Sequence, residues 1–287
     1  MSLLQIAILA LIQGAAELLP VSSSAHVIVA ETLMGLDPAA PQMTFLLVML
    51  HTGTMFAVLF YFWKRWMKLI SPQFFRAIIV ATAVTGIVGF GLKKLIEKVF
   101  MGGGSKAEIE QLFSNLPLIA LALFSAGILI FIAGLKSNCT KSLGDGHDSA
   151  QLTDPRSARI GLVQGLCLPF RGFSRSGATI STSLLMGMPK QLAEDFSFAL
   201  AVVLTPPVIV LELRRLLKAR AETGVDFHMS ALLAPGLFGM ALSFMAGLFA
   251  LKFLSSWLEK GNWKFFGAYC IVFSFFIASY GFYLHAQ

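Results

Sequence analysis

Six long apolar segments constrain most strongly what this chain can fold into. Each is close to the roughly 20 residues that a helix needs to cross the hydrocarbon core of a bilayer. They cover residues 43–62, 75–92, 116–135, 194–213, 230–253 and 263–284. Of the 287 residues, 56% are hydrophobic and only 13% are charged, a composition unlike that of a soluble domain. The sequence therefore predicts an all-α integral membrane protein with six transmembrane helices.

The basic residues are distributed in the way that fixes orientation in a membrane. The net charge is +7, but Lys and Arg occur in short runs beside apolar segments, such as Lys64, Arg65 and Lys68. This placement argues against a nucleic-acid partner, because cytoplasmic loops of membrane proteins are enriched in Lys and Arg. Twelve such residues flank one side of the predicted bundle and eight flank the other. We therefore expect a multi-pass protein with both termini on the periplasmic or extracellular side.

A stretch of about 25 residues occurs twice in the chain. Leu11–Gly14 reads LIQG and Leu162–Gly165 reads LVQG, and each is followed by a Pro, a Ser-containing turn and a second apolar run. The apolar runs beside the two turns cover residues 3–19, 23–34, 159–168 and 176–186. Most of them are too short to span a bilayer. Each copy is therefore predicted to be a re-entrant helix-turn-helix hairpin whose irregular turn lines a polar cavity.

The two hairpins are predicted to face each other in an inverted-topology repeat. Three spans separate them, and an odd number of crossings places the hairpins on opposite sides with their tips near the midplane. The expected organisation is one polytopic domain, 1–287, with a first repeat at 1–135, a second at 156–287 and a polar loop at 136–155. The alternative is that both copies are ordinary helical pairs that resemble each other by chance.

The first predicted tip gathers residues that suit phosphate chemistry. Ionisable groups at membrane depth are costly, so Glu17 and His26 are functional candidates. Ser22, Ser23 and Ser24 precede an apolar run, where a serine can cap a helix whose N–H groups and positive end face a phosphate. Glu17 is a natural ligand for Mg²⁺ or Ca²⁺, and His26 lies within reach of a serine hydroxyl as a general base. The alternative is that the serines only cap and His26 only bonds a carbonyl.

The second predicted tip supplies a cation. Arg175 lies between Ser174 and Ser176 at another helix start, and a guanidinium offers fork-shaped, charge-assisted hydrogen bonds to phosphate oxygens. Thr179, one turn later, adds a hydroxyl. The alternative is that Arg175 is buried for structure alone and needs Glu17 only as its ion-pair partner.

The two motifs together resemble one known family. An (E/Q)xxxE stretch followed by PVSSxxH, with a distant GFSRSGAT, is similar to the undecaprenyl-diphosphate phosphatases, the bacitracin-resistance type of bacterial inner membranes, over nearly the whole chain. The resemblance implies hydrolysis of undecaprenyl (C55 isoprenyl) diphosphate to the monophosphate, which recycles the lipid carrier of cell-wall synthesis. It also implies a requirement for a divalent cation. The oligomeric state stays open, with a homodimer as one candidate.

The candidate site combines the residue chemistry with this resemblance. The catalytic candidates are Ser23, His26, Glu17 and Arg175. The candidates for binding phosphate are Ser22, Ser24, Ser174, Ser176, Thr179 and Arg171. Glu17 is the expected metal ligand, with Gln13 as a weaker second candidate because many members of the family have Glu at that position. Arg171 stands where a Pro is common in the family and adds a cation beside the motif.

Several alternatives remain at the level of sequence. Within the enzyme hypothesis, either Ser23 attacks phosphorus or a metal-bound water attacks while Ser23 positions the phosphate. A lipid-phosphate transporter or flippase is the runner-up, because inverted repeats with broken helices also build transporters. Lipid phosphatases with PSGH signatures are disfavoured, since the second His and Asp are missing at the required spacing. His51, near the start of the first span, either lines the cavity or bonds a helix carbonyl, and the second is favoured.

Overall fold

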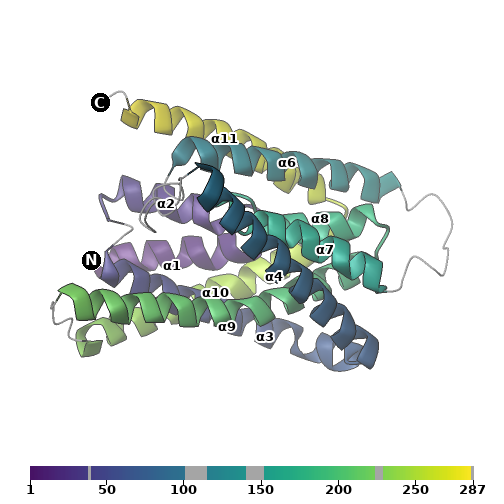
Figure 1. Ribbon diagram of the computed structural model, residues 1–287, viewed down its shortest axis with the longest axis horizontal. Coiled ribbons are helices and arrows are strands. Elements are labelled where there is room, and N and C mark those ends of the chain that lie inside the picture. Colours follow the sequence, from purple (N-terminus) through teal and green to yellow (C-terminus); the bar gives the residue numbers. More distant parts are fainter. Residues whose placement is uncertain (38–39, 101–114, 140–151, 224–228, 286–287) are drawn as a thin grey trace.

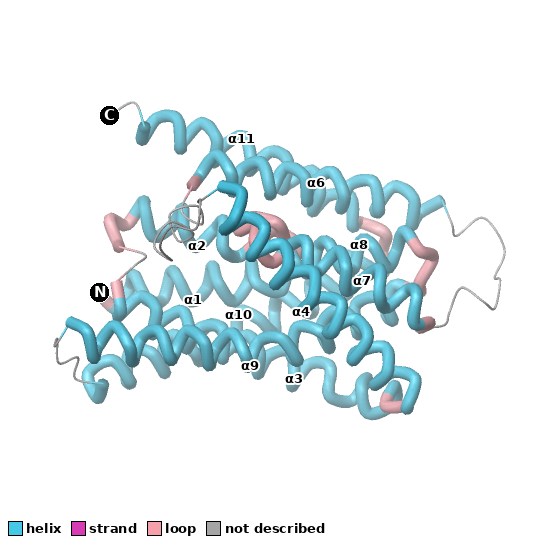
Figure 2. Tube along the Cα trace, in the orientation of Figure 1, coloured by secondary structure: helices cyan, strands magenta, loops and turns pink. Residues whose placement is uncertain are grey.

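The chain is all-helical in the part that its structure describes. The structure is a computed structural model, and it describes residues 1–37, 40–100, 115–139, 152–223 and 229–285 (Figure 1). These residues form helices joined by turns and short loops, as Figure 2 shows. The predicted all-α class is confirmed.

Six of the helices are long and apolar enough to cross a membrane, which confirms the six predicted spans. They are α3 (Pro41–Leu69), α4 (Pro72–Phe100), α6 (Leu116–Cys139), α9 (Lys190–Thr223), α10 (Met229–Glu259) and α11 (Trp263–His285). Most of these helices continue past the predicted ends, because their basic and polar flanks remain helical. The predicted loop 136–155 is shorter on both sides for the same reason, and its residues 140–151 lie outside the described part of the chain.

Four shorter helices form the two hairpins. They are α1 (Leu3–Leu18), α2 (Ser23–Leu33), α7 (Asp154–Cys167) and α8 (Arg175–Leu185). Ser2 and Gln5 form a capping box that starts α1, and a proline lies in the first turn of α7. Both first helices stop just before a proline, Pro20 or Pro169, which cannot donate a helical hydrogen bond.

Glycines of the repeated sequence allow the first helix of each hairpin to pack closely on a spanning helix. α1 packs on α10, and α7 packs on α4. A Cβ atom on Gly14 would lie 2.6 Å from the carbonyl oxygen of Ser243, and one on Gly165 would lie 2.8 Å from Cβ of Val88. Neither approach leaves room for a side chain. The Gln-Gly pair of each copy is therefore a packing signal as well as part of a motif.

A buried ion-pair group joins the end of α3 to the start of α9. Nη1 of Arg65 lies 3.0 Å from Oε2 of Glu194, and Nε of Arg65 lies 2.9 Å from Oδ1 of Asp195. Both carboxylates are almost completely buried, and Glu194 also accepts a hydrogen bond from Ser255 of α10. Removing one partner would leave an unpaired buried charge, which is strongly destabilising. The group therefore holds the start of α9, on which α8 packs.

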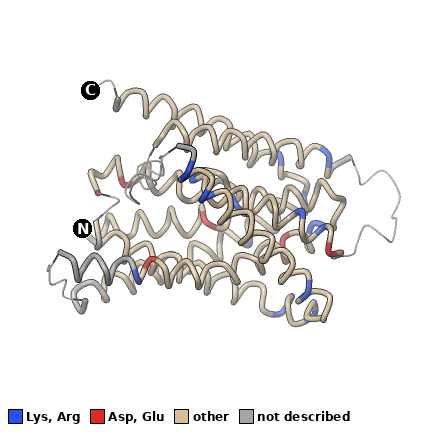
Figure 3. The backbone as a smooth tube through the Cα atoms, viewed as in Figure 1, with Lys and Arg blue, Asp and Glu red and all other residues tan. Residues whose placement is uncertain are grey.

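The two chain termini lie at the same end of the bundle. Figure 1 shows the N and C labels on the left, with α6 and α11 side by side along one edge. Most of the charged residues that Figure 3 colours lie toward the ends of the long helices. Between these ends, each of the six long helices has an apolar stretch with few charged residues. This arrangement agrees with a multi-pass protein.

Candidate active site

The tips of the two hairpins enclose a polar cavity of about 130 Å³. Its lining comes from the end of α1, the start of α2 and the turn before α8. The lining residues are Ala16, Glu17, Ser22, Ser23, Ser24, Phe173, Ser174, Arg175 and Ser176. Seven of the residues proposed from the sequence are among these nine. The two repeated motifs, more than 140 residues apart in the chain, thus contribute to one cavity.

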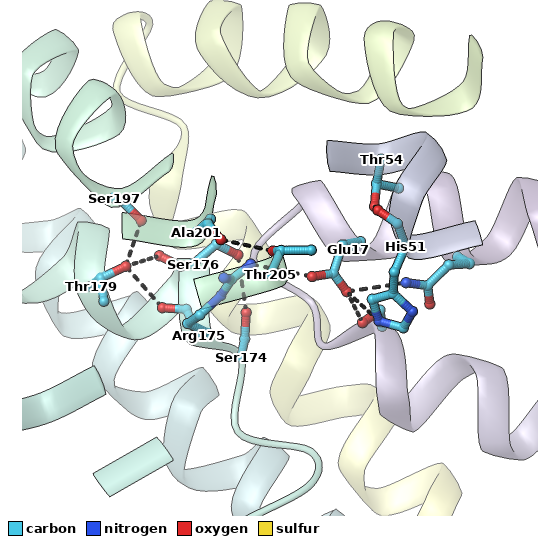
Figure 4. Close-up of polar contacts among 12 residues, drawn as sticks. Glu17, His51, Thr54, Ser174, Arg175, Ser176, Thr179, Ser197, Ala201 and Thr205 are labelled. Atoms are coloured by element: carbon cyan, nitrogen blue, oxygen red, sulfur yellow. Dashed lines mark hydrogen bonds and ion pairs between the residues drawn. The ribbon is translucent and has the colours of Figure 1, made fainter. Parts of the chain in front are cut away.

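Glu17 is the residue on which the polar contacts converge. Its Oε2 accepts a hydrogen bond of 2.5 Å from the Ser23 hydroxyl and one of 3.2 Å from Nε2 of Gln13. Its Oε1 accepts a hydrogen bond of 3.2 Å from Nη2 of Arg175. Figure 4 shows the carboxylate between Arg175 on one side and the ring of His51 on the other. Glu17 therefore connects the serine of the first tip to the cation of the second.

The start of α2 has an unusual backbone conformation. Ser22, its N-cap residue, has φ of 68°, in the left-handed region that residues other than glycine rarely adopt. The Ser22 side chain makes no capping hydrogen bond, and its hydroxyl lies 3.3 Å from that of Ser24. The first turn of α2 thus directs uncapped N–H groups and the positive end of the helix toward the cavity. Strained backbone of this kind is characteristic of functional sites.

The start of α8 is built in the ordinary way. Ser174 is an extended N-cap residue whose hydroxyl accepts a hydrogen bond of 3.2 Å from the backbone N–H of Gly177. In the turn before it, Gly172 has φ of 100° and donates its N–H to Oγ of Ser24 at 3.2 Å. Ser176 donates a hydrogen bond of 3.4 Å to the carbonyl of Leu19. These contacts tie the second tip directly to the first.

His26 lies beside the cavity rather than in its lining. Its Nδ1 is 2.8 Å from the carbonyl oxygen of Ser22, and its Nε2 is 2.7 Å from the hydroxyl of Tyr269 on α11. The ring also stacks on Phe273, with centroids 4.3 Å apart. Both ring nitrogens therefore have partners, and the Ser23 hydroxyl is bonded to Glu17 instead. In this geometry the carboxylate is the nearest proton acceptor to the serine.

Two other candidates for phosphate binding also lie outside the lining. Thr179 is fully buried, and its hydroxyl lies 2.9 Å from the backbone oxygen of Arg175 and 2.5 Å from Oγ of Ser197 on α9 (Figure 4). It thus holds the first turn of α8 against α9. Arg171 is exposed in the turn before α8. Its position is at the periphery of the second tip.

Sequence reasoning missed two residues that contact the site group, Tyr269 and Ser197, and left the role of a third, His51, open between two alternatives. Tyr269 and Ser197 lie 243 and 18 residues from their partners His26 and Thr179, and no local pattern marks either one. His51 had a signal, because it stands with Thr52, Gly53 and Thr54 inside an apolar span. The favoured interpretation of His51, a bond to a helix carbonyl, is confirmed, and His51 is not among the residues that line the cavity. Its Nδ1 lies 2.8 Å from the carbonyl oxygen one turn earlier, and its Nε2 is 3.8 Å from Oε2 of Glu17.

Comparison with known proteins identifies the family of this chain. The family model described as Bacitracin resistance protein BacA matches residues 6–276, which include both hairpins. The chain belongs to this family. Undecaprenyl-diphosphatase 2 of Acinetobacter baylyi is 57% identical over 282 residues, which cover 96% of this chain and 96% of the relative. Undecaprenyl-diphosphatase 2 of Burkholderia ambifaria is 34% identical over 305 residues and covers 100% of this chain and 99% of the relative.

The resemblance to a BacA-type phosphatase seen in the two motifs is thereby confirmed. Because the match extends over nearly the whole chain, it includes the spanning helices as well as the tips. The cavity between the two tips is rich in hydroxyl groups and poor in carboxylates. Glu17 is the one carboxylate among the residues that line this cavity. Among the described residues, no group of three or more His, Cys, Asp and Glu side chains is placed so that it could hold a metal ion.

Proposed function

We propose that this chain hydrolyses undecaprenyl diphosphate to undecaprenyl monophosphate and inorganic phosphate. Family membership and the activity named for its relatives support this function. The structural observation that carries it is the 2.5 Å hydrogen bond from Ser23 to Glu17 in a cavity that also contains Arg175. Attack on phosphorus needs a nucleophile, a proton acceptor and a positive charge, and these three residues supply them. A transporter needs no proton acceptor beside a hydroxyl, so the flippase alternative is disfavoured.

The size of the cavity indicates that only the head group of the lipid substrate binds inside it. A pocket that encloses a drug-sized ligand has a volume of roughly 300–1,000 Å³. The cavity between the tips, at about 130 Å³, has room for a phosphate head group and not for a C55 chain. The isoprenyl chain would therefore remain in the surrounding bilayer, where burial of each CH₂ group contributes about 0.8 kcal/mol. Such a substrate suits an enzyme whose site lies between membrane helices.

The proposed reaction has two steps. First, Oγ of Ser23 attacks the terminal phosphorus while its proton passes to Oε2 of Glu17, and the bond to the bridging oxygen breaks to release undecaprenyl monophosphate. Arg175 and the N–H groups at the start of α2 bind the phosphoryl oxygens as charge moves onto the leaving group. Glu17 then gives this proton to the released monophosphate. In the second step a water molecule transfers a proton to Glu17 as its oxygen attacks the phosphoserine, the bond from phosphorus to Oγ breaks to release phosphate, and Oγ takes the proton from Glu17, which restores both side chains.

His26 has a different part in this proposal from the one expected from the motif. Its hydrogen bonds to Ser22 and Tyr269 hold the strained start of α2, so we assign it to positioning Ser23. The proton acceptor is Glu17, because it already accepts the hydrogen bond of the hydroxyl. Direct attack by water, with Ser23 only binding phosphate, is the alternative that the experiment below separates.

A divalent cation is part of the proposal. Glu17 would hold it through its carboxylate. Gln13 is the weaker candidate, because it turns its amide nitrogen toward Glu17 and its side chain would have to rotate to offer the oxygen to an ion. Oxygen donors of this kind suit Mg²⁺ or Ca²⁺. When bound, such an ion would neutralise part of the charge of the diphosphate.

The membrane topology proposed from the sequence has structural support. A helix of 16 residues such as α1 is about 24 Å long, shorter than the roughly 30 Å core of a bilayer, which suits a re-entrant hairpin. Equivalent helices of the two halves also have equivalent neighbours, since α1 packs on α10 as α7 packs on α4. We propose an inverted repeat in a bacterial inner membrane, with both termini on the periplasmic side. One chain supplies the whole lining, so a homodimer, one candidate for the oligomeric state, is not needed to complete the site.

A phosphate-release assay on purified protein tests the function. Wild type should release phosphate from undecaprenyl diphosphate in detergent, and Ser23→Ala should lose more than about 10³-fold in turnover. Ser125→Ala is the matched control, because this exposed hydroxyl bonds only a carbonyl of its own helix α6. Acid quenching with a substrate labelled at the terminal phosphate should trap labelled phosphoserine at Ser23.

The outcomes separate the alternatives. Full turnover in Ser23→Ala would exclude the serine mechanism. Turnover in wild type without a trapped phosphoserine, and with solvent oxygen entering the phosphate in a single displacement, would favour direct attack by water. A pure, folded protein that released no phosphate would overturn the proposed function.

A further inference from the structure

A continuous stack of aromatic rings begins beside the cavity and follows one face of α11. The His26 ring stacks on Phe273 with centroids 4.3 Å apart and on Tyr269 with centroids 5.7 Å apart. Every stacked pair of the series lies within 16° of parallel. The four rings that α11 contributes are called the aromatic stripe here, in the order Tyr269, Phe273, Phe276 and Tyr280.

The aromatic stripe lies on the outer surface of a spanning helix. Its positions are three or four residues apart, so they share one side of α11. Tyr269 is 45% exposed and Phe276 is 49% exposed, although both are large apolar rings. From Tyr269 to Tyr280 the helix rises about 16 Å. The stripe is therefore an apolar surface that leads away from the first tip along a helix long and apolar enough to cross the bilayer.

His26 connects the aromatic stripe to the cavity. Its Nδ1 lies 2.8 Å from the carbonyl oxygen of Ser22, a lining residue, and its Nε2 lies 2.7 Å from the hydroxyl of Tyr269. One ring thus contacts both the start of α2 and the first residue of the stripe. A lipid whose phosphate groups bind in the cavity would pass these rings if its chain left on this side.

The neighbours of the tips on other sides are polar side chains or closely packed backbone. Toward α3, Glu17 lies 3.8 Å from the ring of His51. Toward α9, the hydroxyl of Thr179 bonds a serine hydroxyl. Toward α6, a Cβ atom on Gly172 would lie 2.4 Å from the carbonyl oxygen of Ile119, which leaves no room for a chain between them. The side of α11 is therefore the one on which an apolar chain meets apolar rings.

We propose that the aromatic stripe binds the isoprene units of the lipid substrate that lie next to the diphosphate. The inference rests on the proposed function and adds the path of the isoprenyl chain to it. An isoprene unit has four chain bonds of about 1.5 Å, so an extended unit spans about 5 Å. Neighbouring rings of the stripe have centroids 5.7 to 6.3 Å apart, a spacing that suits one unit beside each ring. The planar double bond of each unit can pack flat against an aromatic face.

Phosphate release from diphosphates of two chain lengths tests this contact. With the first unit beside Tyr269 and the second beside Phe273, a C10 chain ends before Phe276 and a C55 chain passes it. Phe276→Ala should therefore raise KM for undecaprenyl diphosphate about three- to tenfold at unchanged kcat, and change KM for geranyl diphosphate less than about twofold. Phe275→Ala is the matched control, because this exposed neighbour contacts Phe124 of α6, and it should change neither KM by more than about twofold.

Photo-crosslinking tests the same contact without relying on turnover. The probe is a farnesyl methylenediphosphonate with a diazirine at the far end of its chain. A carbon replaces the bridging oxygen in this analogue, so the proposed reaction cannot cleave it. Mass spectrometry of irradiated wild-type protein should find the label on α11 between Phe276 and Tyr280, and excess undecaprenyl diphosphate should suppress it.

The remaining outcomes are distinct from a failure of the proposed function. Equal changes of KM in Phe276→Ala and Phe275→Ala, or no change in either, would overturn the stripe as a surface for the chain. So would an equal loss with geranyl and undecaprenyl diphosphate, because Phe276 would then act through the structure of the site. Label on α3 or α9 in place of α11 would put the chain elsewhere. If wild type released no phosphate, suppressible labelling of α11 would still support the stripe as a lipid-binding surface while the proposed reaction failed.

Discussion

The second helices of the two hairpins, α2 and α8, start in a similar way but present different side chains at the tips. α2 and α8 each have 11 residues, and each follows a serine N-cap, Ser22 or Ser174. The first helical residue is Ser23 in one tip and Arg175 in the other. The repeat keeps the helix start and changes the group placed there, from a hydroxyl that can attack phosphorus to a cation that can bind it. One duplicated local structure thus provides two complementary halves of a site.

The turns before the two helices explain why only one serine caps its helix. Residues 19–22 connect α1 to α2, whereas residues 168–174 connect α7 to α8 and make the longer turn. The longer turn lets Ser174 adopt an extended backbone, with φ of −63°, and cap Gly177. The shorter turn places Ser22 at φ of 68° without a cap. Strain is therefore concentrated in the tip that holds Ser23, the proposed nucleophile.

The largest effect is expected from a change at Glu17, in the tip that is proposed to carry out the chemical step. Glu17 belongs to the first copy alone, because Leu168 stands at the equivalent position after Gln164. Glu17→Gln removes the proton acceptor of Ser23 and the ion-pair partner of Arg175, so turnover should fall about 10³-fold. Phosphate release from undecaprenyl diphosphate measures it. Turnover within threefold of wild type would contradict the assignment of Glu17 as proton acceptor.

A smaller effect is expected from a change at Arg175, in the tip that is proposed to bind phosphate. Arg175→Lys keeps the charge but loses the planar fork that can bind two phosphate oxygens. We expect kcat/KM to fall about 10- to 100-fold, with KM carrying more of the loss than in Glu17→Gln. Steady-state kinetics over a range of lipid concentrations separates the two constants. A loss confined to kcat would mean that Arg175 acts in the chemical step, and it would contradict the assignment of chemistry to one tip and phosphate binding to the other.

A change in stability should separate the two N-cap serines. Ser174→Ala removes a capping hydrogen bond and should destabilise the protein by about 1 kcal/mol. Ser174→Gly should cost only a few tenths of that, because glycine is tolerated at an N-cap. Thermal unfolding in detergent measures both variants. Equal melting temperatures for wild type and Ser174→Ala would show that this cap contributes no stability.

The smallest expected effect has the opposite sign. Ser22→Gly removes the cost of a left-handed backbone at a residue other than glycine, a cost of roughly 1–2 kcal/mol, but adds the larger chain entropy of glycine. The net result should be a gain of up to about 1 kcal/mol in the same unfolding experiment. Ser24→Gly, inside the first turn of α2, is the matched control and should be destabilising. A destabilised Ser22→Gly would mean that contacts of the Ser22 side chain outweigh the strain.

The sequence was enough to predict that the residues at the two tips belong to the candidate site. Ser23 and Arg175 directly begin apolar runs after a turn, so any hairpin places them at its tip. The roles of His26 and Thr179 could not be predicted in the same way. Each lies far enough into its helix that the direction of its side chain depends on how that helix is rotated against α11 or α9.

The sequence by itself determined the six spans, the two hairpins and the kinds of groups at their tips, because apolar length, helix breakers and motif residues are local properties of the chain. Only the tertiary structure decided which of these groups meet. The pairing of Arg175 with Glu17, the contact of Glu17 with His51 and the hydrogen bond of His26 to Tyr269 depend on helices that are separated in sequence and packed within a few ångströms. A pattern records which residues are present, and packing sets the direction in which each one points.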